Sequence, residues 1–337
     1  MNRRKARNLA LFAAAVVVLI VGTRLWDMRA LARLTPVVRA AASGPDAEAL
    51  ARHVRILAGR IGERNYAHPG ALTGAERYIR GFLALNGYKD APQEYKVRPP
   101  GMSAEVAMKN FIATVPAAAA DAPVLVIGAH YDTAPGTPGA DDNASGVAVL
   151  LELARRFKDK RGGAVELRFV AYGSEEPPFF GTVQMGSAFH AKALKAEGRA
   201  VLGMASLEML GYYDDRPGTQ TYPPPLSLFY PSRANYVGLV ANLDSRAFLK
   251  RFAAAFDSKS TPKIVAALPG WVGEIKLSDH LSYWNEGFPA ILVTDTSFLR
   301  YSHYHMSTDT PDRLDYARMA DVTGGLEAAI ESLRAGN

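Results

Sequence analysis

The chain of 337 residues can hold one large α/β domain or two small ones, and its 48% hydrophobic and 21% charged residues are ordinary for a globular protein. It contains no Cys, which excludes disulfides, cysteine nucleophiles and thiolate zinc sites, so any metal must be held by His, Asp and Glu. Residues 1–40 hold eight Lys and Arg against one Asp, which leaves 31 basic and 32 acidic residues in the rest. Basic residues concentrated beside an apolar run are typical of a segment that contacts a membrane surface, whereas a DNA-binding domain would spread its basic residues over one face. We therefore expect no nucleic-acid partner.

The amino-terminal segment predicts export. Four cationic residues within the first seven precede the apolar run 9–22, LALFAAAVVVLIVG. The run is shorter than the roughly 20 residues that span a bilayer, but Leu25 and Trp26 lengthen it if Arg24 reaches the interface. No small-residue cleavage site follows directly. We therefore predict a signal anchor over residues 1–28 at the cell membrane, with the rest of the chain outside the cytoplasm, and a secreted (periplasmic or extracellular) protein if the segment is cleaved.

Residues 29–48 form a predicted linker and residues 49–337 a predicted single domain. Residues 73–76 have the spacing of a capping box before an apolar-periodic helix, and Asn86 and Gly87 supply its stop. Beyond it, predicted strands (124–128, 165–172, 201–209, 290–294) alternate with predicted helices (145–157, 185–194, 326–333). This alternation of apolar strands and helices indicates an α/β fold with a largely parallel sheet, whose functional sites form at the carboxyl ends of the strands.

Residues 212–270 break this alternation. They contain the loop segment RPGTQTYPPP, followed by a helical portion around 236–256. We interpret them as an insertion that caps one side of the site.

Imidazole and carboxylate groups gather where the predicted strands end. His130 leaves the first of these strands with Asp132 two residues on, which suits a metal-bound imidazole whose other nitrogen donates to a carboxylate, although it is also a common loop pair. Asp141, Asp142 and Asn143 open the next helix. Helix capping would explain one of the two aspartates. Placing two adjacent carboxylates near apolar residues, however, costs free energy unless a cation binds them.

Three further groups follow the later strands. Glu175 and Glu176 are consecutive, so the pleat can point one at a metal and the other at a metal-bound water as general base; a solvated acidic loop is the alternative. Glu208 interrupts an apolar strand, and a carboxylate buried there needs a hydrogen-bonding or cationic partner because burying it unpaired is costly. His305 follows the last strand. Mixed His and carboxylate ligands suit zinc, and a bridging carboxylate suits a hydrolase with two metal ions.

Six segments, in this order, resemble the zinc exopeptidases of metallopeptidase family twenty-eight, which include secreted bacterial leucyl aminopeptidases and aminopeptidase Y. They are GAHYDT, GADDNASG, EEPPFFGTVQMGS, LEMLGYY, SDHLSYWNEGFPA and YHMSTDTPDRLDY, and the likeness covers about residues 52–333. The loop after the glutamate pair is longer than is usual in the family, and HMSTDT stands where HTPxDT is frequent. Neither departure alters a proposed ligand, but both alter the walls of the pocket.

The resemblance implies a three-layer α/β/α fold of the zinc-exopeptidase type, with a mixed, mainly parallel sheet of about eight strands. It implies two Zn²⁺ ions per chain, held by His130, Asp142, Glu176, Glu208 and His305. Asp142 would bridge the ions, Glu175 would be the general base, and Asp132 would orient His130. The implied reaction is hydrolysis of the N-terminal peptide bond of peptides with a free N-terminus, through a water that bridges the two ions.

Three alternatives stay open. A glutaminyl cyclase shares the fold and the carboxylate and His constellation but works with one zinc. A receptor-like ectodomain without catalysis would have lost ligands that are all present here. A dipeptidase or carboxypeptidase is compatible with the same motifs. Tyr212, Tyr301 and Tyr304 are candidates for oxyanion or amine contacts, and the other histidines are assigned structural roles. The preferred side chain and the oligomeric state do not follow from the sequence.

Overall fold

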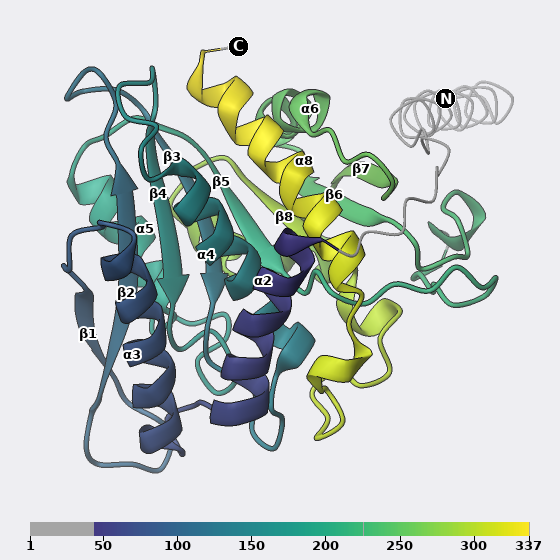
Figure 1. Cartoon of the computed structure of the whole chain (residues 1–337), viewed down its shortest axis with the longest axis horizontal. Coiled ribbons are helices and arrows are strands. Elements are labelled where there is room, and N and C mark those ends of the chain that lie inside the picture. Colours follow the sequence, from purple (N-terminus) through teal and green to yellow (C-terminus); the bar gives the residue numbers. More distant parts are fainter. Residues whose placement is uncertain (1–43, 225, 337) are drawn as a thin grey trace, which may run out of the picture.

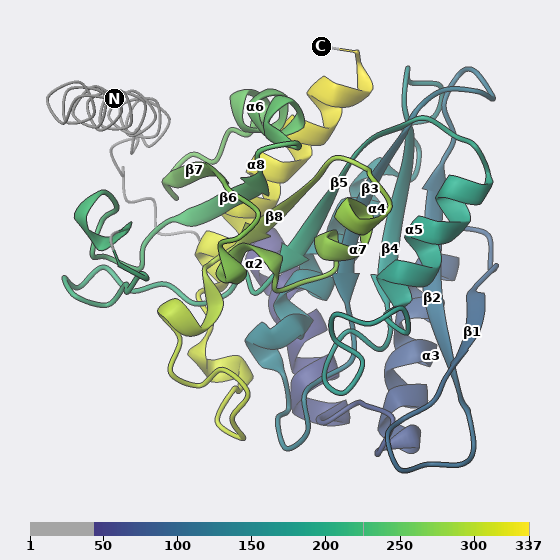
Figure 2. The same cartoon turned by 180° about the vertical axis from the view of Figure 1, so that it is seen from behind.

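The computed structural model describes residues 44–224 and 226–336, in which one central sheet lies between helical layers (Figures 1 and 2). The order of its eight strands is β1-β2-β4-β3-β5-β8-β6-β7. Their bounds are β1 Gln93–Val97, β2 Val106–Val115, β3 Val124–His130, β4 Glu166–Tyr172, β5 Val201–Glu208, β6 Val237–Asn242, β7 Lys263–Leu268 and β8 Ala290–Thr294. This confirms the predicted fold class.

The four central strands β4, β3, β5 and β8 run parallel, so their carboxyl ends meet at one edge of the sheet. At one side β2 pairs antiparallel with β4, and β1 pairs antiparallel with β2. At the other side β6 pairs antiparallel with β8, and β7 is parallel to β6. The sheet is therefore mixed and mainly parallel, as predicted.

Helices cover both faces of the sheet. Their bounds are α2 Pro45–Val54, η1 Arg55–Ile61, α3 Pro69–Leu85, η2 Ala140–Ser145, α4 Gly146–Phe157, α5 Gly186–Ala196, η3 Leu226–Leu228, α6 Arg246–Ala255, η4 Gly273–Lys276, α7 His280–Asn285, η5 Ser297–Leu299, η6 Pro311–Arg313 and α8 Tyr316–Arg334. Figure 1 shows α2, α3, α4 and α8 in front of the sheet, and Figure 2 shows α5 and α7 on the other face.

Alternate residues of the buried strand β3 supply the two cores. Leu125 and Ile127 belong to the larger core cluster together with residues of α2, α4 and α8. Val124 and Val126 belong to a second cluster, which includes residues of α5 and α7. This follows from the two-residue period of a strand, which sends successive side chains to opposite faces. Since both faces are covered, β3 is a continuous apolar run.

Two predicted boundaries are wrong. The helix that a capping box was expected to start at residues 73–76 begins earlier, at Pro69, because Pro is well suited to a first turn whose N–H groups have no helical partner. Its end at Asn86 and Gly87 is confirmed, with Gly87 at a φ of 79°. The predicted linker 29–48 also ends too late, since α2 starts at Pro45 with Asp46 and Glu48 in its first turn.

The predicted insertion 212–270 is only in part a cap. Residues 237–268 supply β6, α6 and β7, which extend the sheet and its helical layer. The helical portion predicted around 236–256 is wrong at its start, which forms β6, and right for Arg246–Ala255, which forms α6. Short apolar runs such as VGLVAN and KIVAAL do not reveal whether they form strand or buried helix, because this is decided by pairing, here of β6 with β8 and of β7 with β6. Residues 212–236 precede β6 and form mostly loop, to the side of the sheet in Figure 2.

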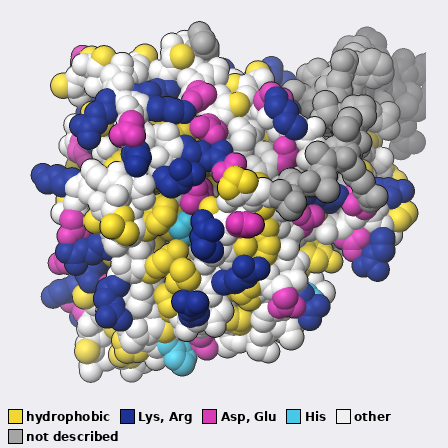
Figure 3. All heavy atoms as spheres, in the orientation of Figure 1, with side chains coloured by type: hydrophobic (Ala, Val, Ile, Leu, Met, Phe, Trp, Pro, Cys, Tyr) yellow, Lys and Arg dark blue, Asp and Glu magenta, His cyan; other side chains and the backbone are white. Residues whose placement is uncertain are grey.

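The face seen in Figure 3 carries Lys and Arg side chains interspersed with Asp and Glu, as the near balance of charges beyond residue 40 predicts. Within residues 44–336, apart from residue 225, no helix is long and apolar enough to cross a membrane. The predicted anchor over residues 1–28 lies outside the described residues, as does most of the predicted linker.

Candidate metal centre

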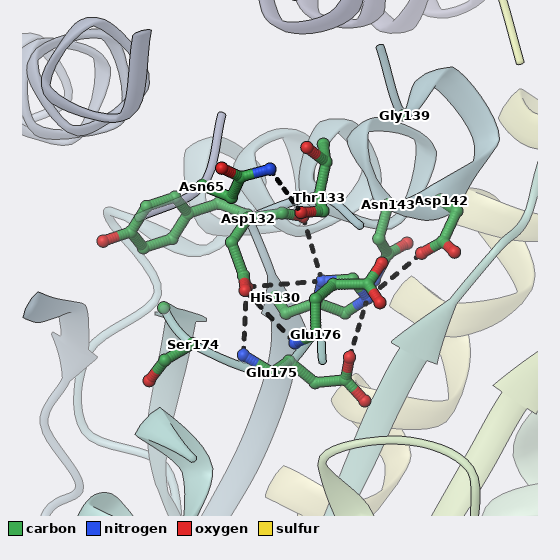
Figure 4. A network of polar contacts seen from close by, with 12 residues as sticks. Asn65, His130, Asp132, Thr133, Gly139, Asp142, Asn143, Ser174, Glu175 and Glu176 are labelled. Carbon is green, nitrogen blue, oxygen red and sulfur yellow. Dashed lines mark hydrogen bonds and ion pairs between the residues drawn. The ribbon is translucent and has the colours of Figure 1, made fainter. Parts of the chain in front are cut away.

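The seven residues singled out from the sequence come together at the carboxyl ends of the central strands. Figure 4 shows His130, Asp132, Asp142, Glu175 and Glu176 among them. His130 is the last residue of β3 and Glu208 the last of β5. Glu175 and Glu176 lie three and four residues beyond the end of β4. Asp142 lies in η2, where the chain turns into α4, and His305 and Asp132 lie in loops.

Asp142 lies between two imidazoles. Its Oδ1 is 3.3 Å from Nε2 of His130, and its Oδ2 is 3.1 Å from Nε2 of His305. Nε2 of His130 is also 3.2 Å from Oε2 of Glu208, and Nε2 of His305 is 3.3 Å from Oε2 of Glu176. Two groups of three ligands therefore share Asp142, and within each group the ligand atoms lie within 4.8 Å of one another.

The chemistry of these residues fits divalent metal ions. Asp142 Oδ1, Glu176 Oε1 and His305 Nε2 are buried and, beyond the ion pairs of Asp142 with the two imidazoles and of His305 with Glu176, make no hydrogen bond to any described residue. Buried polar atoms normally have a partner, and crowded carboxylates are costly without a cation. Two imidazoles and three carboxylates without a thiolate form a ligand set that suits zinc.

The neighbouring carboxylates raise the pKa values of both imidazoles. Burial acts to raise the pKa of Asp142, but His130 and His305 hold it well below its usual range. Burial acts to lower the pKa of His305, but Asp142 and Glu176 raise it to about 10. The pKa of His130 is likewise raised against burial, by Glu208 before the other carboxylates. A bound cation would therefore displace the imidazole protons.

Glu175 and Glu176 have raised pKa values, as expected for a general base or ligand in a buried acidic site. Burial, followed by the charge of Asp142, raises the pKa of Glu176 to about 7. Burial also raises the pKa of Glu175 well above its usual range, and His130 only partly opposes this. Glu175 Oε2 lies 3.8 Å from Nε2 of His130.

Asp132 organises this site through two contacts. Its two carboxylate oxygens accept hydrogen bonds from the backbone N–H groups of Glu175 and Glu176, each at 3.1 Å. Nδ1 of His130 lies 3.6 Å from Oδ1 of Asp132 and donates to its backbone carbonyl at 3.2 Å. The residue expected to orient His130 thus also fixes the strand end that carries the glutamate pair.

Glu208 has the partner that its burial requires. Ser278 donates a hydrogen bond to Oε2 of Glu208 at 2.8 Å. Asn143 donates to the backbone carbonyl of Leu207 at 2.8 Å, and its side-chain oxygen accepts from the backbone N–H groups of Gly146 and Met209. These bonds tie the end of β5 to the turn that carries Asp142.

Sequence reasoning missed Asp309 as a support of the site. Its carboxylate accepts from the backbone N–H groups of Asp141 and Asp142, at 2.9 and 3.2 Å, and from the hydroxyl of Tyr301 at 2.9 Å. Burial raises the pKa of Asp309 to about 6. The signal available in the sequence was its place in HMSTDT, but Asp141 and Asp142, whose N–H groups it binds, lie 168 and 167 residues away.

Arg64, in the segment GERNY, was also missed. Its fully buried guanidinium donates to the backbone carbonyls of Tyr131, Pro138 and Gly139, at 2.7, 2.6 and 2.8 Å. Burial lowers its pKa to about 10, although nearby carboxylates oppose this. Arg64 thereby holds the loop that joins His130 to Asp142.

The remaining histidines do not join the metal groups found among the described residues. His53 lies 3.1 Å from Glu152, and His190 lies 2.5 Å from the Tyr283 hydroxyl. His280 donates to the backbone carbonyl of Ile275. His303 is beside Thr308 and His68 beside Glu63, both near the surface.

Of the three candidate tyrosines, Tyr304 lines the metal pocket. Its ring stacks on His305 with centroids 3.8 Å apart. The Tyr301 hydroxyl is bound to Asp309, and the Tyr212 ring packs on Tyr301. The pocket has an empty volume of about 380 Å³ and is lined by Asp142, Glu175, Glu176, Pro177, Phe180, Glu208, Leu277, Tyr304 and His305.

Relatives of known sequence share most of this chain. Uncharacterized protein YfbL of Escherichia coli (strain K12) is 39% identical over 289 residues, which cover 83% of this chain and 86% of that protein. A probable leucine aminopeptidase of Trichophyton verrucosum (strain HKI 0517) is 29% identical over 225 residues, or 63% of this chain and 52% of the fungal protein. The chain thus spans most of the bacterial relative but about half of the fungal one.

Solved structures share the fold. An aminopeptidase from Aneurinibacillus sp. strain AM-1 matches with a TM-score of 0.62 at 18% identity, over 85% of this chain and 93% of that one. A glutaminyl cyclase from Fimbriiglobus ruber matches with a TM-score of 0.61 at 24% identity, over 88% and 99%. A model described as Peptidase family M28 matches residues 110–329, from within β2 to within α8, a span that holds every proposed ligand. This chain is therefore a member of peptidase family M28.

Proposed function

We propose that the chain is a zinc-dependent aminopeptidase that binds two zinc ions and removes residues from the free N-terminus of peptides. The observation that carries the proposal is Asp142, which offers one oxygen to the group of His130 and Glu208 and the other to the group of Glu176 and His305. Membership of a peptidase family and the names of the relatives support the same class of reaction.

Each proposed residue has a defined task. His130, Asp142 and Glu208 would hold one ion, and Asp142, Glu176 and His305 the other. Bound zinc supplies a Lewis acid for the scissile carbonyl and a water of lowered pKa. The carboxylates around the pocket favour a positively charged amino group, which accounts for a preference for the first residue of a peptide.

Glu175 is the proposed general base. It is buried, its pKa is raised and its backbone N–H is bound by Asp132. Its carboxylate lies 3.8 Å from Nε2 of His130 and belongs to neither of the two ligand groups that share Asp142. It takes the proton of the attacking water and passes it to the leaving amine. Tyr304 lines the same pocket, and its hydroxyl is the proposed donor to the carbonyl oxygen as negative charge develops there.

We also propose, from the sequence of residues 1–28, that the chain is held at the membrane with this domain outside the cytoplasm. Export would expose the site to extracytoplasmic peptides.

Mass spectrometry of the products of the zinc-loaded full chain tests the reaction. The substrates are peptides with free, acetylated and glutaminyl N-termini. We expect stepwise loss of N-terminal residues from the free peptides only. A product lighter by one ammonia, from the glutaminyl peptides alone, would instead make the chain a glutaminyl cyclase. Release of dipeptides or of carboxyl-terminal residues would assign another exopeptidase class, and no product with zinc bound would contradict catalysis.

A further inference from the structure

A chamber larger than the metal pocket opens beside it. Its empty volume is about 930 Å³, against about 380 Å³ for the metal pocket. The two spaces share the lining residues Glu208, Leu277 and Tyr304 and are therefore adjacent. The walls come from residues 222–240, from β7 and from η4. Such a space suits the first side chain of a peptide.

Glu274 is the unusual residue of this chamber. Its side chain is half-buried in a lining that is otherwise mostly apolar and aromatic. It makes no hydrogen bond or ion pair with any residue that the structure describes. Glu274 and Glu208 are the charged residues among those that line the chamber, and Lys276, the cation of the same short helix, is not among them. A carboxylate in these surroundings gains stability when a cation binds.

The aromatic walls provide a second feature that suits a cation. Tyr222, Tyr230, Tyr236 and Phe298 all line the chamber, and guanidinium and ammonium groups bind favourably over aromatic faces. The Tyr230 hydroxyl is buried and has no hydrogen-bond partner among the described residues. Tyr230 packs on the same small core cluster as Ile275, the neighbour of Glu274. Tyr230 therefore adds a hydroxyl without a partner among the described residues to the aromatic wall of the chamber.

The spacing of Glu274 from the metal pocket matches a long side chain. Leu277, at the boundary of the two spaces, directly follows η4, and Glu274 is the second residue of that helix. From Glu274 to Lys276 the 3₁₀-helix advances about 4 Å along its axis, and one further residue of chain adds up to about 3 Å. This is comparable with the length of an extended Lys or Arg side chain, whose apolar stem would lie along the apolar wall while its charged end reaches Glu274.

We propose that Glu274 is a specificity-determining residue, which selects substrates whose first residue is Arg or Lys. This inference rests on the proposed aminopeptidase function and names its substrate class. The carboxylate of Glu274 would bind the cationic end of the side chain, and the tyrosine-lined wall would enclose its stem.

The test compares Arg with citrulline, its neutral counterpart of the same shape, as the first residue of X-Ala-Ala peptides. For the zinc-loaded full chain we expect kcat/KM to be roughly 10- to 100-fold higher for Arg than for citrulline, the range of a hydrogen-bonded charge pair. In Glu274→Gln this ratio should fall to within about 3-fold. Glu286→Gln is the matched control, because Glu286 is half-buried, is paired with Lys195 and does not line the chamber. It should keep the wild-type ratio.

Calorimetric binding of free arginine and free citrulline to the same three proteins gives a readout without turnover. An Arg preference that is lost in Glu274→Gln supports the inference even if no peptide is cleaved, in which case only the proposed reaction fails. Equal binding and equal kcat/KM for Arg and citrulline in the wild-type chain would overturn the inference. An Arg preference that survives in Glu274→Gln would also overturn the inference. In either case, cleavage of Leu-Ala-Ala by the wild-type chain would still support the proposed aminopeptidase function.

Discussion

At the scale of single residues, the two glutamates after β4 differ in their surroundings although they are neighbours. Glu176 lies 3.3 Å from Nε2 of His305, within a metal group that shares Asp142. Glu175 lies at a longer 3.8 Å from His130 and faces the same pocket. Asp132 holds the backbones of both glutamates, and their carboxylates approach different imidazoles. The pair can therefore divide into a ligand and a base.

Glu175→Gln tests this division. The variant keeps the shape of the side chain but cannot accept a proton, so we expect kcat to fall by roughly 10²- to 10⁴-fold or more. Zinc content, measured by elemental mass spectrometry, should stay at the wild-type level because the proposed ligands are intact. Turnover near that of the wild-type chain would remove Glu175 from the role of general base.

Substitutions of Asp142 and Glu208 together test how many zinc ions the site binds. Asp142 belongs to both ligand groups, whereas Glu208 belongs to one. In Asp142→Asn we expect both zinc ions to bind more weakly, and in Glu208→Gln only one. Zinc titration monitored by calorimetry separates the cases. Two weakened steps in Glu208→Gln, or a single binding step in the wild-type chain, would contradict the proposed bridging arrangement.

At the scale of elements, the start of α4 shows how close packing holds the site. A Cβ on Gly146 would lie 2.3 Å from Oδ1 of Asn143 and 2.6 Å from the backbone carbonyl of Leu207. Asn143 ties the metal-ligand turn to β5 through those same groups. The helix can therefore approach the strand only with Gly at this position.

Gly146→Ala should destabilise the fold by about 1–3 kcal/mol, because the strand and Asn143 cannot both keep their places. Zinc affinity should fall as well, since Asp142 precedes Asn143. Gly81→Ala in α3 is the control: nothing lies within 4 Å of a Cβ there, and the better helix former should be neutral or stabilise by up to about 1 kcal/mol. Denaturant unfolding of both variants measures the difference. Equal effects would show that the contact at Gly146 is readily relieved.

At the scale of the whole molecule, metal binding and folding are linked through protons. In the metal-free chain the pKa of Glu176 is raised from 4.5 to about 7, and that of His305 from 6.5 to about 10. A raised pKa stabilises the fold below the unfolded value, and this stability is lost as the pH rises through the folded value. Both groups therefore make the metal-free chain less stable as the pH rises from about 4.5 to about 10.

Zinc should reverse this trend, because bound zinc takes the place of the protons on these ligands. We expect the Tm difference between zinc-loaded and chelator-treated protein to increase from pH 5 through pH 7 to pH 9, measured by differential scanning calorimetry. The Tm of the chelator-treated chain by itself should fall over the same interval. A difference that is largest at pH 5 would contradict the proton displacement.

The sequence by itself determined the residue types of the site and their order along the chain. The absence of Cys left His and carboxylates as ligands, and apolar runs marked β3, β4, β5 and β8 to within two residues at either end. This is possible because the period of a strand and the residues that follow its carboxyl end are local features. The family resemblance named five ligands, which the structure places in two groups that share Asp142.

Only the tertiary structure decided which atoms meet. Asp309 reaches Asp141 over 168 residues, and Arg64 reaches Gly139 over 75, distances at which no local pattern carries information. Strands β6 and β7 were mistaken for part of a cap because their short apolar runs acquire strand geometry only by pairing, β6 with β8 and β7 with β6. Glu274 gave no signal in the sequence, since its meaning comes from the chamber that surrounds it.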